Sequence, residues 1–170
     1  MQVGYYLSTP KKGRRTAIKP HIPTLYVLIG IPGSGKSTFS DGLGMPVVST
    51  DEIRRELFGN EEDQQNSDKV FETAFTRAAT FLNIGYDVCF DATNTTEWGR
   101  KILLRKVKLR AYTEFRKVAI LFMTPVEECK RRNASRQRVV PEDVIDRQYR
   151  QLMRDAHTIP DQYDEVVVIE

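Results

Sequence analysis

Residues 30–37 match the pattern G-x-x-x-x-G-K-[ST] and are followed by Thr38. Glycines let backbone N–H groups converge on phosphate oxygens, and a lysine and a hydroxyl at this spacing reach the outer phosphates and a Mg²⁺ ion. We therefore predict a polyphosphate-binding loop, in which Lys36 contacts the outer phosphates and Ser37 ligates the metal. The residues expected to touch the phosphates are Gly33, Ser34, Gly35, Lys36, Ser37 and Thr38.

A carboxylate and a guanidinium follow at Asp51 and Arg54, just after a short apolar run that ends in Ser49-Thr50. Three residues apart on a helix, the two side chains share one face. Asp51 could accept the proton of an attacking hydroxyl, while Arg54 grips a phosphate of the same substrate through two parallel hydrogen bonds. The alternative is a helix-capping Asp with a salt bridge. Beside a phosphate-binding loop, we favour the acceptor site.

Asp91 ends another apolar run and is followed by Ala92-Thr93-Asn94. A carboxylate at the end of a buried strand near a phosphate-binding loop commonly helps to hold Mg²⁺. The alternative is a simple turn, for which Asp, Thr and Asn are also well suited. We predict Asp91 as a metal-site residue together with Ser37.

Residues 130–138 carry five basic side chains between two expected helices. Arg132 and Arg136 are four apart, so they would converge on one polyphosphate if helical geometry persists. Such arginines offset the charge of a moving phosphoryl group. We predict a basic lid over the phosphate-binding loop, the alternative being an ordinary solvated basic surface.

Apolar runs predict strands that would position these residues, at 25–29, 45–49, 86–90, 117–123 and 165–169. Helical patterns fall between them, at 39–43, 51–58, 68–82, 98–111, from Pro125 onward, and 142–155. Alternation of strands and helices predicts an α/β fold with a mostly parallel five-stranded sheet and helices on both faces. Ligands bind beyond the carboxyl ends of such strands, so the candidate residues and Thr124 should meet at one edge.

The net charge of +3 conceals an uneven distribution, because residues 25–99 carry five basic and twelve acidic side chains and residues 100–138 carry thirteen and three. This indicates either a polyanionic ligand near residues 100–138 or a solvated basic helix. Residues 1–24 hold five basic side chains and no acidic one. We interpret them as an arm preceding one domain at residues 25–170, which either contacts a nucleic acid or has no specific role.

The chain contains two cysteines, Cys89 and Cys129, without C-x-x-C spacing. We interpret both as reduced thiols, which favours a cytoplasmic location. No apolar run approaches the ~20 residues of a membrane-spanning helix, so no membrane partner is expected.

In the order of its motifs the chain resembles the P-loop polynucleotide 5′-kinases of phages and bacterial end-healing enzymes. The resemblance covers Tyr26 to about Ile159. It is carried by the phosphate-binding loop, Ser49-Thr50-Asp51-Glu52-Ile53-Arg54, Asp91-Ala92-Thr93-Asn94, Arg132-Asn133-x-x-Arg136 and Val140-Pro141. The resemblance implies a P-loop kinase fold with a basic lid, ATP or another nucleoside triphosphate and Mg²⁺ as cofactors, and the 5′-hydroxyl end of DNA or RNA as substrate.

Matched position by position, the resemblance implies a catalytic set of Lys36, Asp51, Arg54, Arg132 and Arg136. Asp51 corresponds to the general base and Arg54 to the residue that grips the acceptor's terminal phosphodiester. Arg132 and Arg136 correspond to lid arginines on the donor phosphates. A small-molecule P-loop kinase, acting on an antibiotic, a sugar acid or adenylyl sulfate, is the alternative enzyme. A nucleotide-dependent switch is disfavoured because Asp51 and Arg54 have no evident purpose in one.

Overall fold

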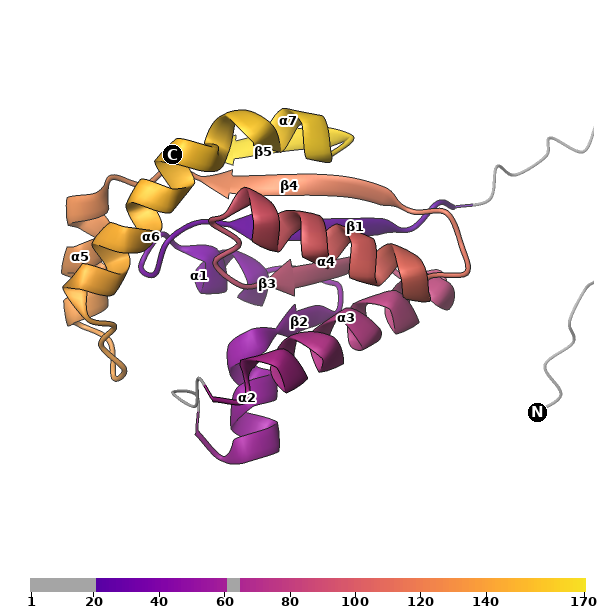
Figure 1. The fold of residues 1–170 in the computed structure, drawn as a ribbon, viewed down its shortest axis with the longest axis horizontal. Coiled ribbons are helices and arrows are strands. Elements are labelled where there is room, and N and C mark those ends of the chain that lie inside the picture. The colour runs from indigo at the N-terminus through magenta and orange to yellow at the C-terminus, as the bar shows by residue number, and fades with distance from the viewer. Residues whose placement is uncertain (1–20, 61–64) are drawn as a thin grey trace, which may run out of the picture.

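A computed structural model describes residues 21–60 and 65–170, and residues 1–20 of the expected basic arm lie outside these ranges. Five strands form one sheet in the order β2-β3-β1-β4-β5, and every neighbouring pair is parallel (Figure 1). The strands are β1 (Thr24–Ile29), β2 (Val47–Ser49), β3 (Val88–Asp91), β4 (Arg116–Phe122) and β5 (Glu165–Ile169). The expected α/β architecture with its parallel sheet is confirmed.

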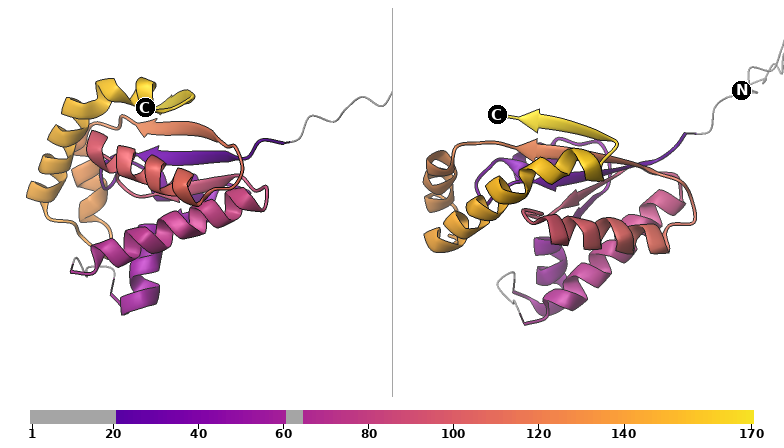
Figure 2. Two further views of the ribbon diagram at one scale, coloured as in Figure 1. Left: turned by 45° about the vertical axis from the view of Figure 1, so that its right-hand side comes forward. Right: turned by 45° about the horizontal axis from the view of Figure 1, so that its top comes forward.

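Helices cover both faces of the sheet, as the alternation predicted. They are α1 (Lys36–Asp41), α2 (Thr50–Phe58), α3 (Ser67–Asn83), α4 (Glu97–Arg110), α5 (Val126–Ala134), α6 (Glu142–Asp155), the 3₁₀ turn η1 (Ala156–Thr158) and α7 (Ile159–Gln162). The views of Figure 2 show α3, α4 and α6 on one face and α1 on the other. Helix α5 lies beyond the carboxyl ends of the strands, next to α6. Among the described residues no helix is both long and apolar enough to cross a membrane.

The core divides into two apolar clusters because the central strands are buried on both faces. In β4, Val118, Ile120 and Phe122 join the cluster under α1, whereas Ala119 and Leu121 join the larger one under α3, α4 and α6. Successive side chains of a strand point to opposite faces, and near-continuous apolar strands are typical of parallel sheets. The continuous apolar runs in the sequence therefore follow directly from the fold.

Local side-chain chemistry sets where the helices begin. The Ser49 hydroxyl accepts a hydrogen bond from Glu52 N at 3.4 Å at the start of α2, and the Thr96 hydroxyl accepts one from Gly99 N at 3.1 Å at the start of α4. Such caps satisfy N–H groups that have no partner within the helix. Capping at Ser49 leaves Asp51 in the first turn of α2, where its side chain is exposed.

Some predicted boundaries were wrong by a few residues, for reasons visible in the backbone. Helix α1 starts at Lys36 rather than Phe39, because Phe39 N already donates to Gly35 O at 3.0 Å. Strand β2 starts at Val47 rather than Met45, since Pro46 lacks an N–H group. The sequence analysis did not predict η1 and α7, which follow α6.

Much of the excess positive charge of residues 100–138 is used inside the fold. Arg100 is fully buried and donates to the carbonyls of Asn94 and Asp155 at 3.0 and 2.9 Å. Lys106 and Arg110 of α4 both pair with Glu72 of α3. These cations bind protein groups, so they do not contribute to the excess charge that a polyanionic ligand near this segment would meet.

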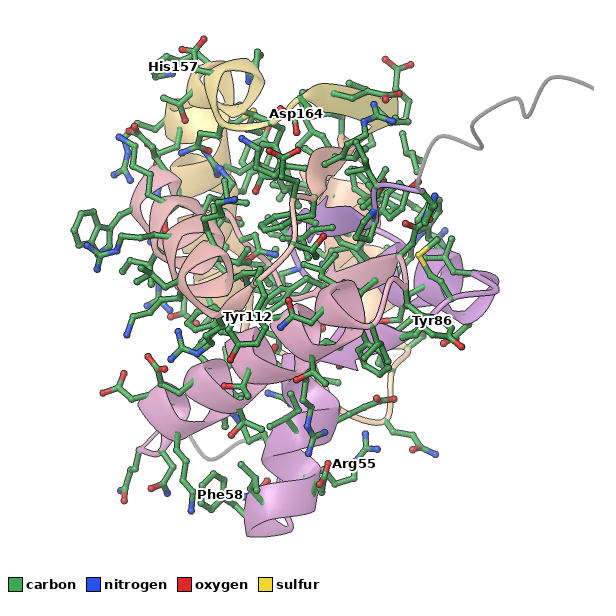
Figure 3. All side chains as sticks on the ribbon, turned by 90° about the vertical axis from the view of Figure 1, so that its right-hand side faces the viewer. Arg55, Phe58, Tyr86, Tyr112, His157 and Asp164 are labelled. Carbon is green, nitrogen blue, oxygen red and sulfur yellow. The ribbon has the colours of Figure 1, made fainter. Side chains whose placement is uncertain are left out.

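The surface formed by the amino ends of the strands lies opposite the candidate site. Figure 3 looks onto this surface and shows Tyr86 and Tyr112 on it, with Phe58 at the far end of α2. Tyr112 is 94% exposed and none of the predicted site residues lies here. The predicted site residues lie at the opposite edge.

Candidate active site

The loop of residues 30–37, here called the P-loop, connects β1 to α1. Gly33 and Gly35 have φ values of 82° and 101°, which only glycine adopts without strain. A Cβ atom on Gly33 would lie 2.3 Å from the carbonyl oxygen of Cys129 in α5. The bare backbone of Gly33 therefore lets α5 pack directly against the P-loop.

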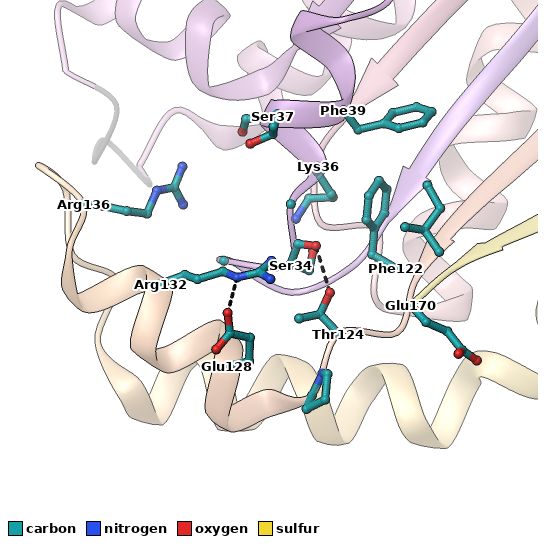
Figure 4. Close-up of a pocket in the computed structure, with 15 residues that line it drawn as sticks. Ser34, Lys36, Ser37, Phe39, Phe122, Thr124, Glu128, Arg132, Arg136 and Glu170 are labelled. Atoms are coloured by element: carbon teal, nitrogen blue, oxygen red, sulfur yellow. Dashed lines mark hydrogen bonds and ion pairs between the residues drawn. The ribbon is translucent and has the colours of Figure 1, made fainter.

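A cavity of about 830 Å³ opens over the P-loop (Figure 4). Its lining includes every residue predicted to bind the donor phosphates, namely Gly33, Ser34, Gly35, Lys36, Ser37, Thr38, Arg132 and Arg136. Thr124 lies two residues after β4, and its hydroxyl donates a hydrogen bond to Ser34 O of the P-loop at 3.0 Å. Separate segments of the chain thus converge on one hollow at the carboxyl edge of the sheet.

Lys36 is buried within the P-loop, and its Nζ donates to Gly30 O and Ile31 O, both at 2.9 Å. Burial lowers the pKa of Lys36 from 10.5 to about 8, although the negative charge of Asp91 opposes this change. Burial disfavours the charged form of an ammonium group. The site therefore holds a cation that any nearby phosphate would stabilise.

Asp91 ends β3 and lies beside the end of β2, since Ser49 and Asp91 are partners in the strand register. The Thr50 hydroxyl donates to Asp91 O at 3.4 Å, which ties the start of α2 to this position. Burial raises the pKa of Asp91, and the charge of Lys36 counteracts that rise. A second cation near Asp91 would stabilise its ionised form.

The residues predicted for metal binding fit Mg²⁺ but do not form a cage. Within residues 21–60 and 65–170, no three His, Cys, Asp or Glu side chains gather in a metal-binding cluster. Mg²⁺ is commonly held by one or two protein oxygens together with substrate phosphates. The exposed Ser37 hydroxyl in the cavity and the Asp91 carboxylate supply oxygen ligands of the right kind.

Asp51 and Arg54 do not line the P-loop cavity and form a separate pair beside it. Arg54 Nη1 donates to Asp51 Oδ1 at 3.0 Å. The Asp51 side chain is 58% exposed, whereas that of Arg54 is only 6% exposed. Asp51 is near enough to Lys36 that its charge contributes to the pKa of the lysine. The predicted acceptor pair and the predicted phosphate site are thus neighbours at one edge.

Two polar side-chain atoms in this region are buried without a hydrogen-bond partner. They are Ser34 Oγ in the P-loop and Arg54 Nε on α2. An unsatisfied buried donor typically costs ~1–3 kcal/mol, so native proteins rarely retain one without a reason. Each of the two neighbouring sites contains one such atom.

The predicted lid is partly helical. Helix α5 ends at Ala134, so Arg132 lies on the helix and Arg136 lies in the turn that follows. The α-helix does not extend to Arg136, but a hydrogen bond from Arg136 N to Asn133 O at 3.1 Å continues the turn, and both arginine side chains point toward the P-loop (Figure 4). Glu128 accepts from Arg132 Nε at 2.6 Å and also from Arg131, and these hydrogen bonds hold the pKa of Glu128 at about 2.

A family model described as an AAA domain matches residues 25–155 of this chain. The match covers more than half of the sequence and includes the P-loop, Asp51, Asp91 and Arg132. The chain belongs to the AAA domain family. No curated protein matches it.

Solved structures similar to this AAA domain have the P-loop kinase fold. A chain of the Pnkp1/Rnl/Hen1 RNA repair complex aligns with a TM-score of 0.70 and 23% identity, over 81% of this chain and 46% of that one. This chain therefore spans less than half of that relative's length. A gluconokinase from Sinorhizobium meliloti aligns with a TM-score of 0.55 and 17% identity, covering 88% of this chain and 83% of its own. Shikimate kinase from Acinetobacter baumannii aligns with a TM-score of 0.53 and 17% identity, over 89% and 86%.

Three residues of this AAA domain support the predicted site although sequence analysis assigned them no role, Asn133 and Arg138 being included there only in a motif and in a basic segment. Glu128 holds Arg132, Asn133 is buried and bonds to Val140, and Arg138 approaches Asp51. Asn133 is a buried polar residue on a predicted helix, and Glu128 and Arg132 are four residues apart within α5, so both had a signal in the sequence. The contact of Arg138 depends on where α5 ends.

Proposed function

We propose that this domain is a polynucleotide 5′-hydroxyl kinase that transfers the γ-phosphate of ATP, or of another nucleoside triphosphate, to the 5′ end of DNA or RNA. The observation that carries this proposal is the Asp51–Arg54 pair beside Lys36. An exposed carboxylate is held by a buried guanidinium that retains an unpartnered donor. A hydroxyl next to a phosphodiester matches both groups, because one accepts a proton and the other binds an anion.

In the proposed reaction, the 5′ oxygen of the strand attacks the γ-phosphorus while Asp51 accepts the hydroxyl proton. The bond from the γ-phosphorus to the bridging oxygen breaks, and the nucleoside diphosphate leaves. Lys36, Arg132 and Arg136 offset the charge on the phosphoryl oxygens and on the leaving group. Ser37 and Asp91 would hold Mg²⁺, which would offset the negative charge of the phosphates.

Similarity to a chain of an RNA repair complex is consistent with a nucleic-acid acceptor. A small-molecule kinase is the competing proposal, and a specific observation favours it. Gluconokinase and shikimate kinase structures align over more than four fifths of both chains, so the fold alone suits compact acceptors as well. Their acceptors, a sugar acid and a cyclic acid, are also anionic alcohols that a guanidinium can bind.

We expect the purified protein to transfer labelled γ-phosphate from ATP to a 5′-hydroxyl oligonucleotide in the presence of Mg²⁺. The same oligonucleotide carrying a 5′-phosphate is the matched control and should gain no label, because it offers no free 5′ hydroxyl. Gluconate and shikimate, tested in parallel, should remain unlabelled. Labelling of either small acid, with none of the oligonucleotide, would overturn the proposed acceptor in favour of the competing one.

Triphosphate binding should weaken as the pH rises above 8. The pKa of Lys36 in the free protein is about 8, and a bound phosphate raises it by stabilising the ammonium form. Below pH 8 the lysine is already charged and binding needs no proton. Above pH 8 binding must take up a proton, so the dissociation constant of a non-hydrolysable ATP analogue should rise about tenfold between pH 7 and pH 9.

Isothermal titration calorimetry at both pH values, with buffers of different ionisation enthalpy, measures this affinity and the proton uptake directly. Lys36→Met is the matched control, because it retains the length of the side chain without a titrating group. Equal pH dependence in the wild type and in Lys36→Met would assign the effect to the nucleotide and not to Lys36.

A further inference from the structure

We propose that Arg138 is a second anion-binding residue of the acceptor site, and that it clamps the phosphodiester next to the accepting hydroxyl together with Arg54. The assignment rests on the proposed polynucleotide kinase function. It adds a residue from the lid to a site that was otherwise built from α2 alone.

The geometry around Asp51 carries this assignment. Arg54 Nη1 and Arg138 Nη1 lie 3.0 and 3.7 Å from the same atom, Asp51 Oδ1. The two guanidinium groups come from elements distant in sequence, α2 and the turn after α5. Groups that both reach one carboxylate oxygen can also both reach the oxygens of one phosphate.

The turn that carries Arg138 is held by a buried clamp. Asn133, which is 1% exposed, donates from Nδ2 to Val140 O at 2.8 Å and accepts at Oδ1 from Val140 N at 3.0 Å. The two ends of residues 133–140 are thereby joined. Within this closed turn Arg136 lines the P-loop cavity and Arg138 faces Asp51. One short segment thus contacts both the donor side and the acceptor side.

The chemistry of the base explains why a second guanidinium is useful here. When Asp51 takes up a proton it loses its charge and ceases to be an ionic partner for either arginine. Arg54 is 5% exposed, and leaving a buried guanidinium without an anion is costly. A phosphodiester held between Arg54 and Arg138 would supply the negative charge at that step. Arg138, whose side chain is 32% exposed, can reach an incoming strand from the solvent side.

The test compares Arg138→Gln with wild type on 5′-hydroxyl trinucleotides that differ in one linkage. One trinucleotide has two phosphodiester linkages. Another has a neutral methylphosphonate at the linkage nearest the 5′ end, here called the first linkage. The last has the methylphosphonate at the other linkage, here called the second linkage. Arg150→Gln is the control, because Arg150 is an exposed arginine on α6. Arg138→Lys tests whether charge alone rescues binding.

On the all-phosphodiester trinucleotide, Arg138→Gln should raise the KM at least about tenfold, as expected for loss of a charge-assisted hydrogen bond. The kcat and the KM for ATP should change less than about threefold, whereas a folding defect would lower the apparent kcat and leave the KM for the trinucleotide unchanged. The wild-type protein should bind the trinucleotide with a neutral first linkage weakly, and Arg138→Gln should not weaken that binding further. Arg138→Lys should recover part of the affinity, and Arg150→Gln should behave as wild type.

Other outcomes overturn the assignment in distinguishable ways. A normal KM in Arg138→Gln would remove Arg138 from the acceptor site while the kinase function stands. If the increase in KM caused by Arg138→Gln disappears only when the second linkage is neutral, Arg138 contacts the second phosphodiester. That result would overturn the proposal that Arg54 and Arg138 bind the same phosphate. Failure of wild type to label any of the three trinucleotides would overturn the proposed function itself, and this assignment with it.

Discussion

Replacing Lys36 with methionine is expected to lower kcat for phosphoryl transfer by about 10²–10³-fold, the loss typical of removing one donor aimed at developing transition-state charge. The ammonium group lies inside the P-loop, where two carbonyl oxygens hold it at 2.9 Å and where little water competes. Charge on the phosphoryl oxygens grows there in the transition state. Methionine fills the same space but offers no positive charge. Steady-state kinetics at saturating ATP measure the loss.

The fold should survive this change, because Lys36 is a buried cation and removing it relieves a desolvation cost. Without the positive charge of Lys36, the pKa of Asp91 would rise further. Asp91 would then be protonated more readily, so the variant would not have to bury an unpaired carboxylate. The unfolding temperature without nucleotide should stay within a few degrees of wild type. Turnover above a tenth of wild type would show that Lys36 does not act on the transferred group.

The site residues whose placement follows most directly from the sequence are those that lie within a single motif. The P-loop encodes its own conformation, since Gly33 and Gly35 adopt positive φ and Lys36 reaches carbonyls five and six residues earlier. Asp91 ends an apolar strand and Asp51 follows one by two residues, and neighbouring parallel strands bring their carboxyl ends to the same edge.

The contacts that were not predicted depend on the exact register of α5 and its turn. Arg136 and Arg138 are two residues apart, yet one lines the P-loop cavity and the other faces α2. That divergence follows from the end of α5 at Ala134 and from the Asn133 clamp. Helix ends are the least certain part of a sequence-based assignment, so the second acceptor-side arginine stayed hidden.

Charge counting from sequence does not separate the basic residues at the predicted site from those used inside the fold. The basic segment does include the lid arginines, which line the cavity. It also includes Arg100, which binds the loop between β3 and α4 through Asn94 O at 3.0 Å. Asn94, at φ 50°, in turn donates to Leu28 O at 2.7 Å at the end of β1. A buried arginine of this kind organises the edge of the sheet from within and cannot be told from a surface cation by composition.

Replacing Asp51 with asparagine is expected to lower kcat by about 10²–10⁴-fold, the range typical of a general base. Asparagine has nearly the same shape but accepts no proton at neutral pH, so the hydroxyl loses its proton acceptor. The KM for ATP should change little, because Asp51 does not line the P-loop cavity. Single-turnover measurements with a 5′-hydroxyl oligonucleotide report the chemical step directly.

A structural role for Asp51 predicts a different result, which makes the variant decisive. Its side chain pairs with the buried guanidinium of Arg54 three residues later, so a purely structural role predicts a loss of stability when the carboxylate charge is removed, with near-normal turnover of the folded protein. Glu52→Gln is the matched control, since Glu52 is the adjacent exposed carboxylate in the first turn of α2. If both variants keep near-normal turnover, Asp51 serves only the helix terminus and its salt bridge. If only Asp51→Asn fails, the exposed position of this carboxylate is explained by its access to the incoming hydroxyl.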